Sequence, residues 1–364
     1  MKQIPIPDLP VHCVINAQGT LAQAISASVP VDELLRAYRN MVLIRQFDKK
    51  AVALQRTGQL GTYASSLGQE AISTAIGLSM RDQDVFAPYY RDTAAQYLRG
   101  VPLHKLLAYW GGDETGNHFG EFASQDLPNC VPIATQLSHA AGIATAVKIR
   151  AEKRAVVVTC GDGATSRGDF YESINLAGVW QLPLVVVVNN NQWAISVPRH
   201  LQTAAPTIAH KAYAAGIPCQ RVDGNDAAAM LEVMHAALER AYCGKGATLI
   251  EAISYRLCDH TTADDATRYR SSDELNHAWE NEPIKRLQTW LHQNGHWNEE
   301  KEKALFAECA SIIDAEVDRY LQLPSQIPED FFDYLFDDVP WAMQAQRQQF
   351  IERFHQRGGA QHGR

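Results

Sequence analysis

The sequence lacks the signatures of several common protein classes. No apolar stretch reaches about 18 residues and no apolar region follows Met1, so we expect neither a membrane span nor a signal peptide. The net charge of −8 at pH 7 argues against nucleic acid and anionic membranes as partners. No Cys-x-x-Cys pair occurs among the seven cysteines, which are Cys13, Cys130, Cys160, Cys219, Cys243, Cys258 and Cys309. This odd, scattered set predicts reduced thiols in a cytoplasmic protein rather than a disulfide or zinc framework.

Two widespread nucleotide-binding motifs are also absent. The chain has no Gly-x-Gly-x-x-Gly pattern of the dinucleotide-binding type, and no Gly-Lys-Ser/Thr closes a glycine loop as in P-loop proteins. We find no internal repeats and no linker that would separate independent domains. With 364 residues, 46% of them apolar and 20% charged, the chain is long enough for one large α/β domain with appendages, or for two domains.

Two buried strands, each ending in polar residues, are the most informative feature that is present. The first runs through Val156-Val157-Val158-Thr159 and ends at Gly161-Asp162-Gly163. The second, Leu184 to Val188, begins about twenty residues after Gly163 and ends at Asn189-Asn190-Asn191. A stretch of helical period separates them, as in a strand, helix, strand unit of a parallel sheet. We therefore predict an α/β fold with a mostly parallel central sheet and helices on both faces.

The two strand ends also predict a site. Asp162 and Asn191 would lie at adjacent carboxyl ends, where one carboxylate and one amide suffice for Mg²⁺ when phosphate oxygens complete its shell. Glycines let backbone N–H groups approach a phosphate, and the start of a helix adds partial positive charge. The alternatives are an ordinary Gly-Asp-Gly turn and an Asp162 side chain that only caps the following helix.

The remaining pattern divides the chain into three regions. We predict an N-terminal arm over residues 1–30, which either lies on another surface, such as that of a partner subunit, or is frayed, and a main domain over residues 31–325. A helical C-terminal segment covers residues 326–364 and ends in a polar tail that we expect to be disordered. The expected strands are 155–160, 184–189, 219–222 and 248–254. The expected helices are 31–56, 71–78, 92–99, 103–110, 134–149, 168–180, 207–215, 226–243, 273–294 and 298–321.

Several motifs then identify a family. They are Gly68-Gln69-Glu70-Ala71, Pro88-Tyr89-Tyr90-Arg91-Asp92, Gly161 to Glu172, Asn190 to Ser196, Val222 to Asp226, Tyr255-Arg256, and the loop from Asp259 to Arg270. From about residue 35 to residue 345, the chain resembles the alpha subunit of the thiamine diphosphate-dependent 2-oxo acid dehydrogenases. These are the decarboxylating components of the pyruvate and branched-chain 2-oxo acid dehydrogenase complexes. The resemblance implies the thiamine diphosphate-binding fold.

The resemblance implies thiamine diphosphate and Mg²⁺ as cofactors. Asp162, Asn191 and the backbone carbonyl of Trp193 would be the metal ligands, and the N–H groups of Gly163 and Ala164 would bind the diphosphate. Tyr90 and Arg91 would both touch the cofactor, since a fixed guanidinium binds phosphate oxygens bidentately. Read alone, Arg91 has an alternative role as the ion-pair partner of Asp92 or Asp84.

The segment before the alanine-rich helix has implied roles as well. Backbone groups of Val131 and Ile133 would meet the aminopyrimidine ring, with the Ile133 side chain supporting the bent cofactor. Thr135 and Gln136 resemble a monovalent-cation site of the branched-chain enzymes, although Cys130 stands where that site has a serine. Without the resemblance, Ile133 reads as a core residue and Thr135 as a helix cap.

His260 is the implied catalytic residue, because the family histidine at this position faces the cofactor and assists acyl transfer to lipoamide. Its alternative is a solvated surface histidine. We expect Asp265, Tyr269 and Arg270 to order the loop around it. Tyr63, Ala64 and Tyr89 are predicted to shape the substrate pocket, and Ala64 stands where pyruvate-specific members often carry a histidine.

The function implied is oxidative decarboxylation of a 2-oxo acid, with pyruvate as the predicted substrate and branched-chain 2-oxo acids as the alternative. Acyl groups would pass to lipoyl groups of a dihydrolipoyl acyltransferase. Thiamine catalysis also needs a carboxylate at the pyrimidine ring, and the chain holds one diphosphate-type domain without a second copy. A beta subunit in an α2β2 heterotetramer is therefore implied. Other hypotheses are an acetoin dehydrogenase alpha subunit and a regulatory subunit with a dead site.

Overall fold

A parallel six-stranded sheet forms the centre of the computed structural model, which describes residues 7–121, 123–324, 326–333 and 335–356. The strand order is β1-β7-β8-β4-β3-β2, and every neighbouring pair runs parallel. The strands are β1 (Val11–His12), β2 (Val85–Ala87), β3 (Val156–Gly161), β4 (Leu184–Asn190), β7 (Cys219–Asp223) and β8 (Thr248–Ile253). The predicted α/β class is confirmed, and the four expected strands are present to within two residues at each end.

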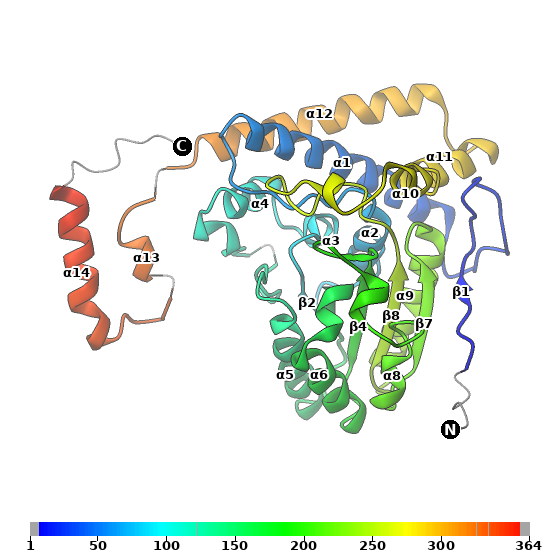
Figure 1. Cartoon of the computed structure of the whole chain (residues 1–364), viewed down its shortest axis with the longest axis horizontal. Coiled ribbons are helices and arrows are strands. Elements are labelled where there is room, and N and C mark those ends of the chain that lie inside the picture. Colours follow the sequence, from blue (N-terminus) through cyan, green and yellow to red (C-terminus); the bar gives the residue numbers. More distant parts are fainter. Residues whose placement is uncertain (1–6, 122, 325, 334, 357–364) are drawn as a thin grey trace.

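Helices cover both faces of the sheet (Figure 1). Successive residues of a strand point to opposite faces, so β3 contributes to two separate cores. Val156, Val158 and Cys160 pack in the cluster formed with α5 (Thr135–Ile149), α6 (Gly168–Val179) and α8 (Lys211–Ala214). Val157 belongs to the opposite cluster, which includes α1 (Val31–Arg56), α2 (Glu70–Ser79) and α9 (Ala227–Tyr242).

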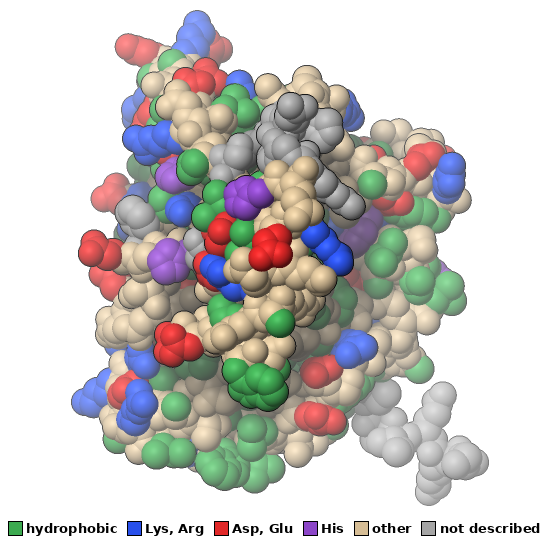
Figure 2. Space-filling model, turned by 90° about the vertical axis from the view of Figure 1, so that its left-hand side faces the viewer, with side chains coloured by type: hydrophobic (Ala, Val, Ile, Leu, Met, Phe, Trp, Pro, Cys, Tyr) green, Lys and Arg blue, Asp and Glu red, His purple; other side chains and the backbone are tan. Residues whose placement is uncertain are grey.

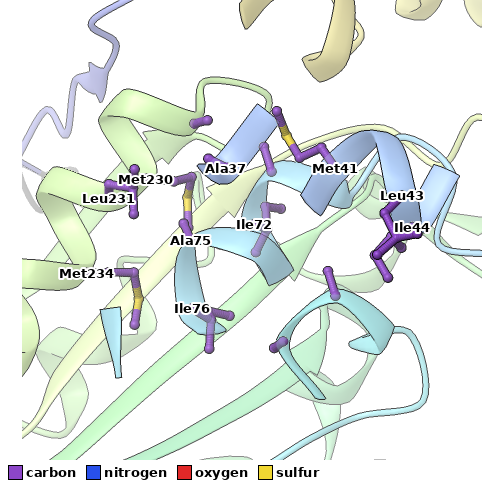
Figure 3. Close-up of a cluster of buried hydrophobic side chains, with 14 of the residues drawn as sticks. Ala37, Met41, Leu43, Ile44, Ile72, Ala75, Ile76, Met230, Leu231 and Met234 are labelled. Atoms are coloured by element: carbon purple, nitrogen blue, oxygen red, sulfur yellow. The ribbon is translucent and has the colours of Figure 1, made fainter. Parts of the chain in front are cut away.

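The larger core lies where α1, α2 and α9 meet (Figure 3). Met41 and Ile44 from α1, Ile72 and Ile76 from α2, and Met230 from α9 are all buried members of this core cluster. Further helices extend this layer. They are α3 (Thr93–Leu98), α4 (Leu103–Trp110), α10 (Ser272–Trp279), α11 (Pro283–Gln293) and α12 (Glu299–Leu321). The short elements η1 (Glu114–Asn117), η2 (Asp162–Ser166) and η3 (Ala266–Arg268) are 3₁₀ turns.

Two predicted helices differ in the structure. The single helix expected over residues 273–294 is divided into α10 and α11, because Pro283 starts a new helix at a position that the Glu282 side chain caps. The helix expected over residues 207–215 is reduced to α8. Upstream of it the Ala209 N–H donates to the Glu251 carboxylate at 3.0 Å, so that group is bonded outside any helix. A hairpin of β5 (Trp193–Ala194) and β6 (Val197–Pro198), followed by α7 (Arg199–Gln202), was not predicted.

The described part of the N-terminal arm lies on the sheet of its own chain. β1 pairs with β7 through Val11 and Arg221, and the N–H groups of Val14 and Ile15 donate to the buried Asp226 carboxylate at 2.6 and 2.7 Å. These bonds contradict the frayed interpretation for residues 11–15, and they show that this part of the arm lies on the sheet of its own chain.

The C-terminal segment is bonded to the main domain at its start, since Gln326 Nε2 donates to the Gly112 carbonyl at 3.1 Å, and its last helix stands apart from the sheet (Figure 1). It contains α13 (Asp330–Asp333) and α14 (Trp341–Gln356), joined by ring contacts of Phe331 and Phe332 with Phe350. Trp341 is 85% exposed. The face that this segment occupies shows hydrophobic side chains beside acidic and basic ones (Figure 2). The expected disordered tail, residues 358–364, lies outside the described residues.

Two expectations from composition can be compared with the structure. All seven cysteines are free. None of the helices in the described part of the chain combines the length and the apolar character that a membrane crossing requires.

Candidate active site

The carboxyl ends of three neighbouring strands bring the predicted residues together. Gly161, the last residue of β3, is paired with Asn189 in β4, and Asn190 is paired with Ile253, the last residue of β8. The residues that follow therefore meet at one edge of the sheet. These are Asp162 after β3, Asn191 after β4 and the segment leading to Arg256 after β8, as the sequence predicts for the first two.

A cavity opens at this edge, and most of the predicted site residues line it. Tyr89, Tyr90, Arg91, Ile133, Gln136, Asp162, Gly163, Ala164, Asn191, Trp193 and His260 form its wall together with Cys130, Ala134, Gly161, Ala194 and Ile195. Four residues named from the sequence are not part of the wall, namely Tyr63, Ala64, Val131 and Thr135. Ala194 and Ile195 come from the β5–β6 hairpin, which the sequence pattern does not predict.

Asp162 is buried at the base of the cavity, with 2% of its surface exposed. Burial raises the pKa of its carboxyl group to about 6, although Gln202 Nε2 donates a hydrogen bond to Oδ2 at 2.8 Å. Among the described residues, no Lys, Arg or His lies within ion-pair distance of this carboxylate. The alternative in which Asp162 caps the following helix is not realised, since Gly161 precedes η2 and Arg167 precedes α6.

The glycines on either side of Asp162 have different surroundings. A Cβ atom on Gly163 would lie 2.6 Å from the Cβ of Ala194, so the hairpin can pack here only against a glycine. A Cβ on Gly161 would meet no atom within 4 Å, because that side of the backbone faces the open cavity. The turn that follows is the 3₁₀ helix η2, and α6 starts only at Gly168. The chain thus offers empty space beside backbone N–H groups at a glycine-flanked turn.

The guanidinium group of Arg91 is hydrogen-bonded to two other segments of the cavity wall region. Its Nη1 donates to the Ser65 carbonyl, and its Nη2 donates to the His260 carbonyl at 2.6 Å. The alternative ion pairs are not formed. Asp92 instead accepts bonds from the Tyr89 N–H and the Thr159 hydroxyl, and Asp84 accepts the N–H groups of Arg81 and Ala155. The guanidinium is buried at the cavity and has no carboxylate partner there among the described residues.

His260 faces two arginines. Its Nδ1 lies 3.1 Å from Arg91 Nη2 and 3.4 Å from Arg256 Nη1. Burial and then these two positive charges lower the pKa of the imidazole to about 4. Because guanidinium groups only donate, Nδ1 is the acceptor, and the single proton of the neutral ring resides on Nε2. His260 is therefore not the solvated surface histidine of the alternative interpretation.

The loop around His260 is ordered by hydrogen bonds, as expected, and Asp264, which was not predicted, takes part beside Asp265. Asp264 accepts the His260 N–H at 2.8 Å and the Tyr269 hydroxyl. Arg256 Nη2 donates to the Tyr269 oxygen at 2.7 Å, and Arg270 donates to the Arg256 carbonyl. Asp265 faces outward and caps the turn η3.

The residues around the start of α5 do not all lie where the sequence predicts. Ile133 lines the cavity rather than the core and is 45% exposed, whereas Val131 is 50% exposed and outside the wall. Ala134, in the left-handed conformation, is the residue before α5, so Thr135 is inside the helix and is not its cap. Gln136 is buried and donates to the Thr159 carbonyl at 2.9 Å. Its Oε1 has no hydrogen-bond partner among the described residues.

Of the three predicted substrate-pocket residues, only Tyr89 lines the cavity. Ala64 is buried, and the Tyr63 hydroxyl donates to Asp48 Oδ1 at 3.0 Å, away from the cavity wall. Asp48, which also accepts from Ser65 and Ser66, thereby fixes the segment whose carbonyl holds Arg91. Sequence reasoning missed Asp48. Its signal was an acidic residue on the apolar face of α1, between the buried Ile44 and Ala51.

The donor set fits a magnesium diphosphate. Among the described residues, no group of three His, Cys, Asp or Glu could hold a metal ion by itself. Asp162, the Asn191 side-chain oxygen and a backbone carbonyl are hard oxygen donors that leave positions for phosphate oxygens, as Mg²⁺ prefers. Three observations are consistent with a polar ligand in the cavity. Asp162 is buried without an ion-pair partner among the described residues, there is space at Gly161, and Gln136 Oε1 has no hydrogen-bond partner among the described residues.

Comparison with known proteins agrees with this geometry. Residues 38–329 match the sequence model of the family described as "Dehydrogenase E1 component". A Mycobacterium tuberculosis protein named 3-methyl-2-oxobutanoate dehydrogenase subunit alpha is 40% identical over 322 residues, which is 88% of this chain and 87% of the relative. Pyruvate dehydrogenase E1 component alpha subunits are also similar. The Staphylococcus aureus protein is 37% identical, covering 88% of this chain and 87% of its own length, and the Bacillus cereus protein is 35% identical, covering 93% and 92%.

Proposed function

The chain belongs to the dehydrogenase E1 component family, and we propose that it is the alpha subunit of an enzyme that oxidatively decarboxylates a 2-oxo acid. The family is thiamine diphosphate-dependent, and its members of both substrate types are oxidoreductases. The observation that carries the proposal is the convergence of Asp162, Asn191, Arg91 and His260 on one cavity at the carboxyl edge of the sheet.

In this proposal, each part of the cavity has a task. Asp162, Asn191 and the Trp193 carbonyl hold Mg²⁺, and the N–H groups of Gly163 and Ala164 bind the diphosphate together with Arg91. Bound thiamine diphosphate supplies the electron sink for loss of carbon dioxide. Arg91 is already buried and oriented, so little side-chain freedom is lost when an anion replaces its present carbonyl partners.

His260 is proposed to handle protons during acyl transfer to a lipoyl group. The two arginines keep its Nδ1 as an acceptor, so Nε2–H is the donor toward the cavity. An imidazole that remains neutral at pH 7 can donate this hydrogen bond without adding a positive charge beside Arg91 and Arg256.

A partner subunit completes the site in this proposal. Apart from Asp162, no acidic residue of the described chain lines the cavity, so the carboxylate that thiamine catalysis requires at the pyrimidine ring has to come from another chain. Exposed apolar side chains of α5 and α6, including Ile149 at 72% and Val179 at 71%, offer surface for such a partner to cover. We propose a beta subunit, an α2β2 heterotetramer and a lipoyl-bearing acyltransferase as the assembly.

Pyruvate is the proposed substrate, and a branched-chain 2-oxo acid is the second candidate. Relatives named pyruvate dehydrogenase support the first, and the Mycobacterium tuberculosis relative supports the second. Tyr89 forms part of the wall, but its hydroxyl already donates to Gln69 at 2.7 Å, so the pocket is closed there by a fixed aromatic ring.

The test is decarboxylation by the chain copurified with its beta partner, using an artificial electron acceptor. Pyruvate is compared with 3-methyl-2-oxobutanoate, and a pocket that distinguishes one or two methyl groups should separate their kcat/KM values by about tenfold or more. We expect the higher value for pyruvate. A higher value for the branched acid would reject pyruvate alone, whereas decarboxylation of neither acid would reject the proposed function.

A further inference from the structure

A buried lysine lies directly behind the turn that carries Asp162. Lys211, the first residue of α8, is 6% exposed. Its ammonium group donates to the carbonyl of Thr165 at 2.7 Å and to the Thr165 hydroxyl at 2.9 Å. The same hydroxyl donates to the Asp162 carbonyl at 2.8 Å. Lys211 is thus connected through one threonine to the backbone of the residue that is proposed to bind Mg²⁺.

The ammonium group of Lys211 is buried without an ion pair in the described part of the chain. No carboxylate of a described residue lies within ion-pair distance of its ammonium group. The rings of Tyr171 and Phe170 lie 5.3 and 5.9 Å away and provide only a weak cation–π attraction. Removing an ammonium group from water is strongly unfavourable unless a negative charge compensates it. Hydrogen bonds to one carbonyl and one hydroxyl do not supply this negative charge, so they alone do not account for a buried lysine here.

We propose that Lys211 is a positioning residue for the diphosphate, a role that rests on the proposed function. Its two hydrogen bonds hold η2 in the shape that presents the Gly163 and Ala164 N–H groups to the cavity. Its charge is compensated by the anion that binds on the opposite side of the same turn. Lys211 does not line the cavity, so it acts through Thr165 and the backbone.

The charge is the property that separates this role from ordinary packing. Lys211→Met keeps a long apolar chain but loses charge and donors, Lys211→Gln keeps a donor without charge, and Lys211→Arg restores both. Lys148 offers a matched control, because it also donates to two carbonyls, those of Trp180 and Gln181, but at the far end of α6 and at the protein surface.

The experiment measures binding of Mg²⁺ with inorganic pyrophosphate to the full-length chain by titration calorimetry. Circular dichroism and thermal unfolding first establish that each variant is folded. We expect Lys211→Met and Lys211→Gln to raise the Kd at least tenfold, and Lys211→Arg to remain within threefold of the wild type. Lys148→Met should leave the Kd unchanged. If the neutral Lys211 variants fail to fold, Thr165→Val provides the test, because it removes the hydroxyl link but keeps the lysine. We expect Thr165→Val to raise the Kd threefold or more and Thr165→Ser to return the Kd to the wild-type value.

The outcomes distinguish this inference from the function on which it rests. If Lys211→Met binds magnesium pyrophosphate as tightly as the wild type, the role of Lys211 is overturned and the proposed function stands. If the neutral Lys211 variants do not fold, wild-type affinity in Thr165→Val leads to the same conclusion. A lowered affinity in Lys211→Met that Lys211→Arg does not restore also overturns the role assigned to the charge. If the wild-type chain binds neither magnesium pyrophosphate nor thiamine diphosphate, the proposed function fails and this inference fails with it.

Discussion

Replacing Asp48 tests how the interior of α1 supports the site. Asp48 is 3% exposed, and its carboxylate accepts the Ser66 N–H at 2.8 Å, the Tyr63 hydroxyl at 3.0 Å and the hydroxyls of Ser65 and Ser66. These bonds fix the segment whose Ser65 carbonyl receives Arg91. Asp48→Ala leaves the Ser66 N–H and the Tyr63 hydroxyl without their acceptor, and each unsatisfied buried donor costs about 1–3 kcal/mol. We therefore expect the free energy of unfolding to fall by about 3–5 kcal/mol.

Asp48→Asn should cost less, because an amide oxygen still accepts the Ser66 N–H and the Tyr63 hydroxyl while the negative charge is lost. Hydrogen bonds to charged acceptors contribute more than those to neutral ones, so we expect a loss of about 1–3 kcal/mol. Urea unfolding followed by tryptophan fluorescence measures both values. The control is Asp314→Ala, which removes an exposed ion pair with Lys50 and should change the stability by less than about 1 kcal/mol. An Asp48→Ala protein as stable as this control would refute the reasoning.

Four further predictions concern the cavity. Asp162→Ala should abolish Mg²⁺-dependent binding of thiamine diphosphate in calorimetry, and unaltered binding would rule out the metal assignment. Gly161→Ala should change the free energy of unfolding by less than about 0.5 kcal/mol but weaken cofactor binding. Gly163→Ala should lower the free energy of unfolding by about 1–3 kcal/mol, because its Cβ would meet Ala194. Equal stability of the two variants in urea unfolding would contradict this difference. His260→Ala should slow lipoyl acylation more than the first decarboxylation, and equal loss of both rates would argue against the proposed role. Folding lowers the pKa of His260 from 6.5 to about 4, so the unfolded chain binds the extra proton between these values and stability should fall as the pH drops through this window. His260→Gln should remove this part of the acid sensitivity, and parallel stability curves for variant and wild type would contradict the shift.

The strand ends were predictable because their signal is local and repeated. Val156 to Val158 and Leu184 to Val188 are β-branched or apolar without interruption, which a strand buried on both faces requires. Each is followed at once by glycine or asparagine, and parallel strands place such endings at the same edge. The adjacency of Asp162 and Asn191 therefore follows from the pattern alone, and so does the α/β class.

Contacts between segments far apart in sequence were not predictable in the same way. Nothing near Asp226 indicates that its carboxylate holds the N–H groups of Val14 and Ile15, which lie 212 and 211 residues earlier. The family resemblance predicts that Tyr63 lies in the substrate pocket. Only the packing of α1 shows that its hydroxyl turns toward Asp48.

The sequence by itself determined the parallel sheet, the glycine turn after β3 and the adjacency of Asp162 and Asn191. These properties depend on residue type, short-range order and the fixed geometry of parallel strands, whereas the roles predicted for Arg91 and His260 came from the family resemblance. Tertiary structure alone decided which tautomer His260 adopts, which aspartate orders its loop and which cations are buried without a counter-charge. Those outcomes depend on distances between side chains brought together from different elements, and on the loss of water around them, neither of which a linear pattern contains.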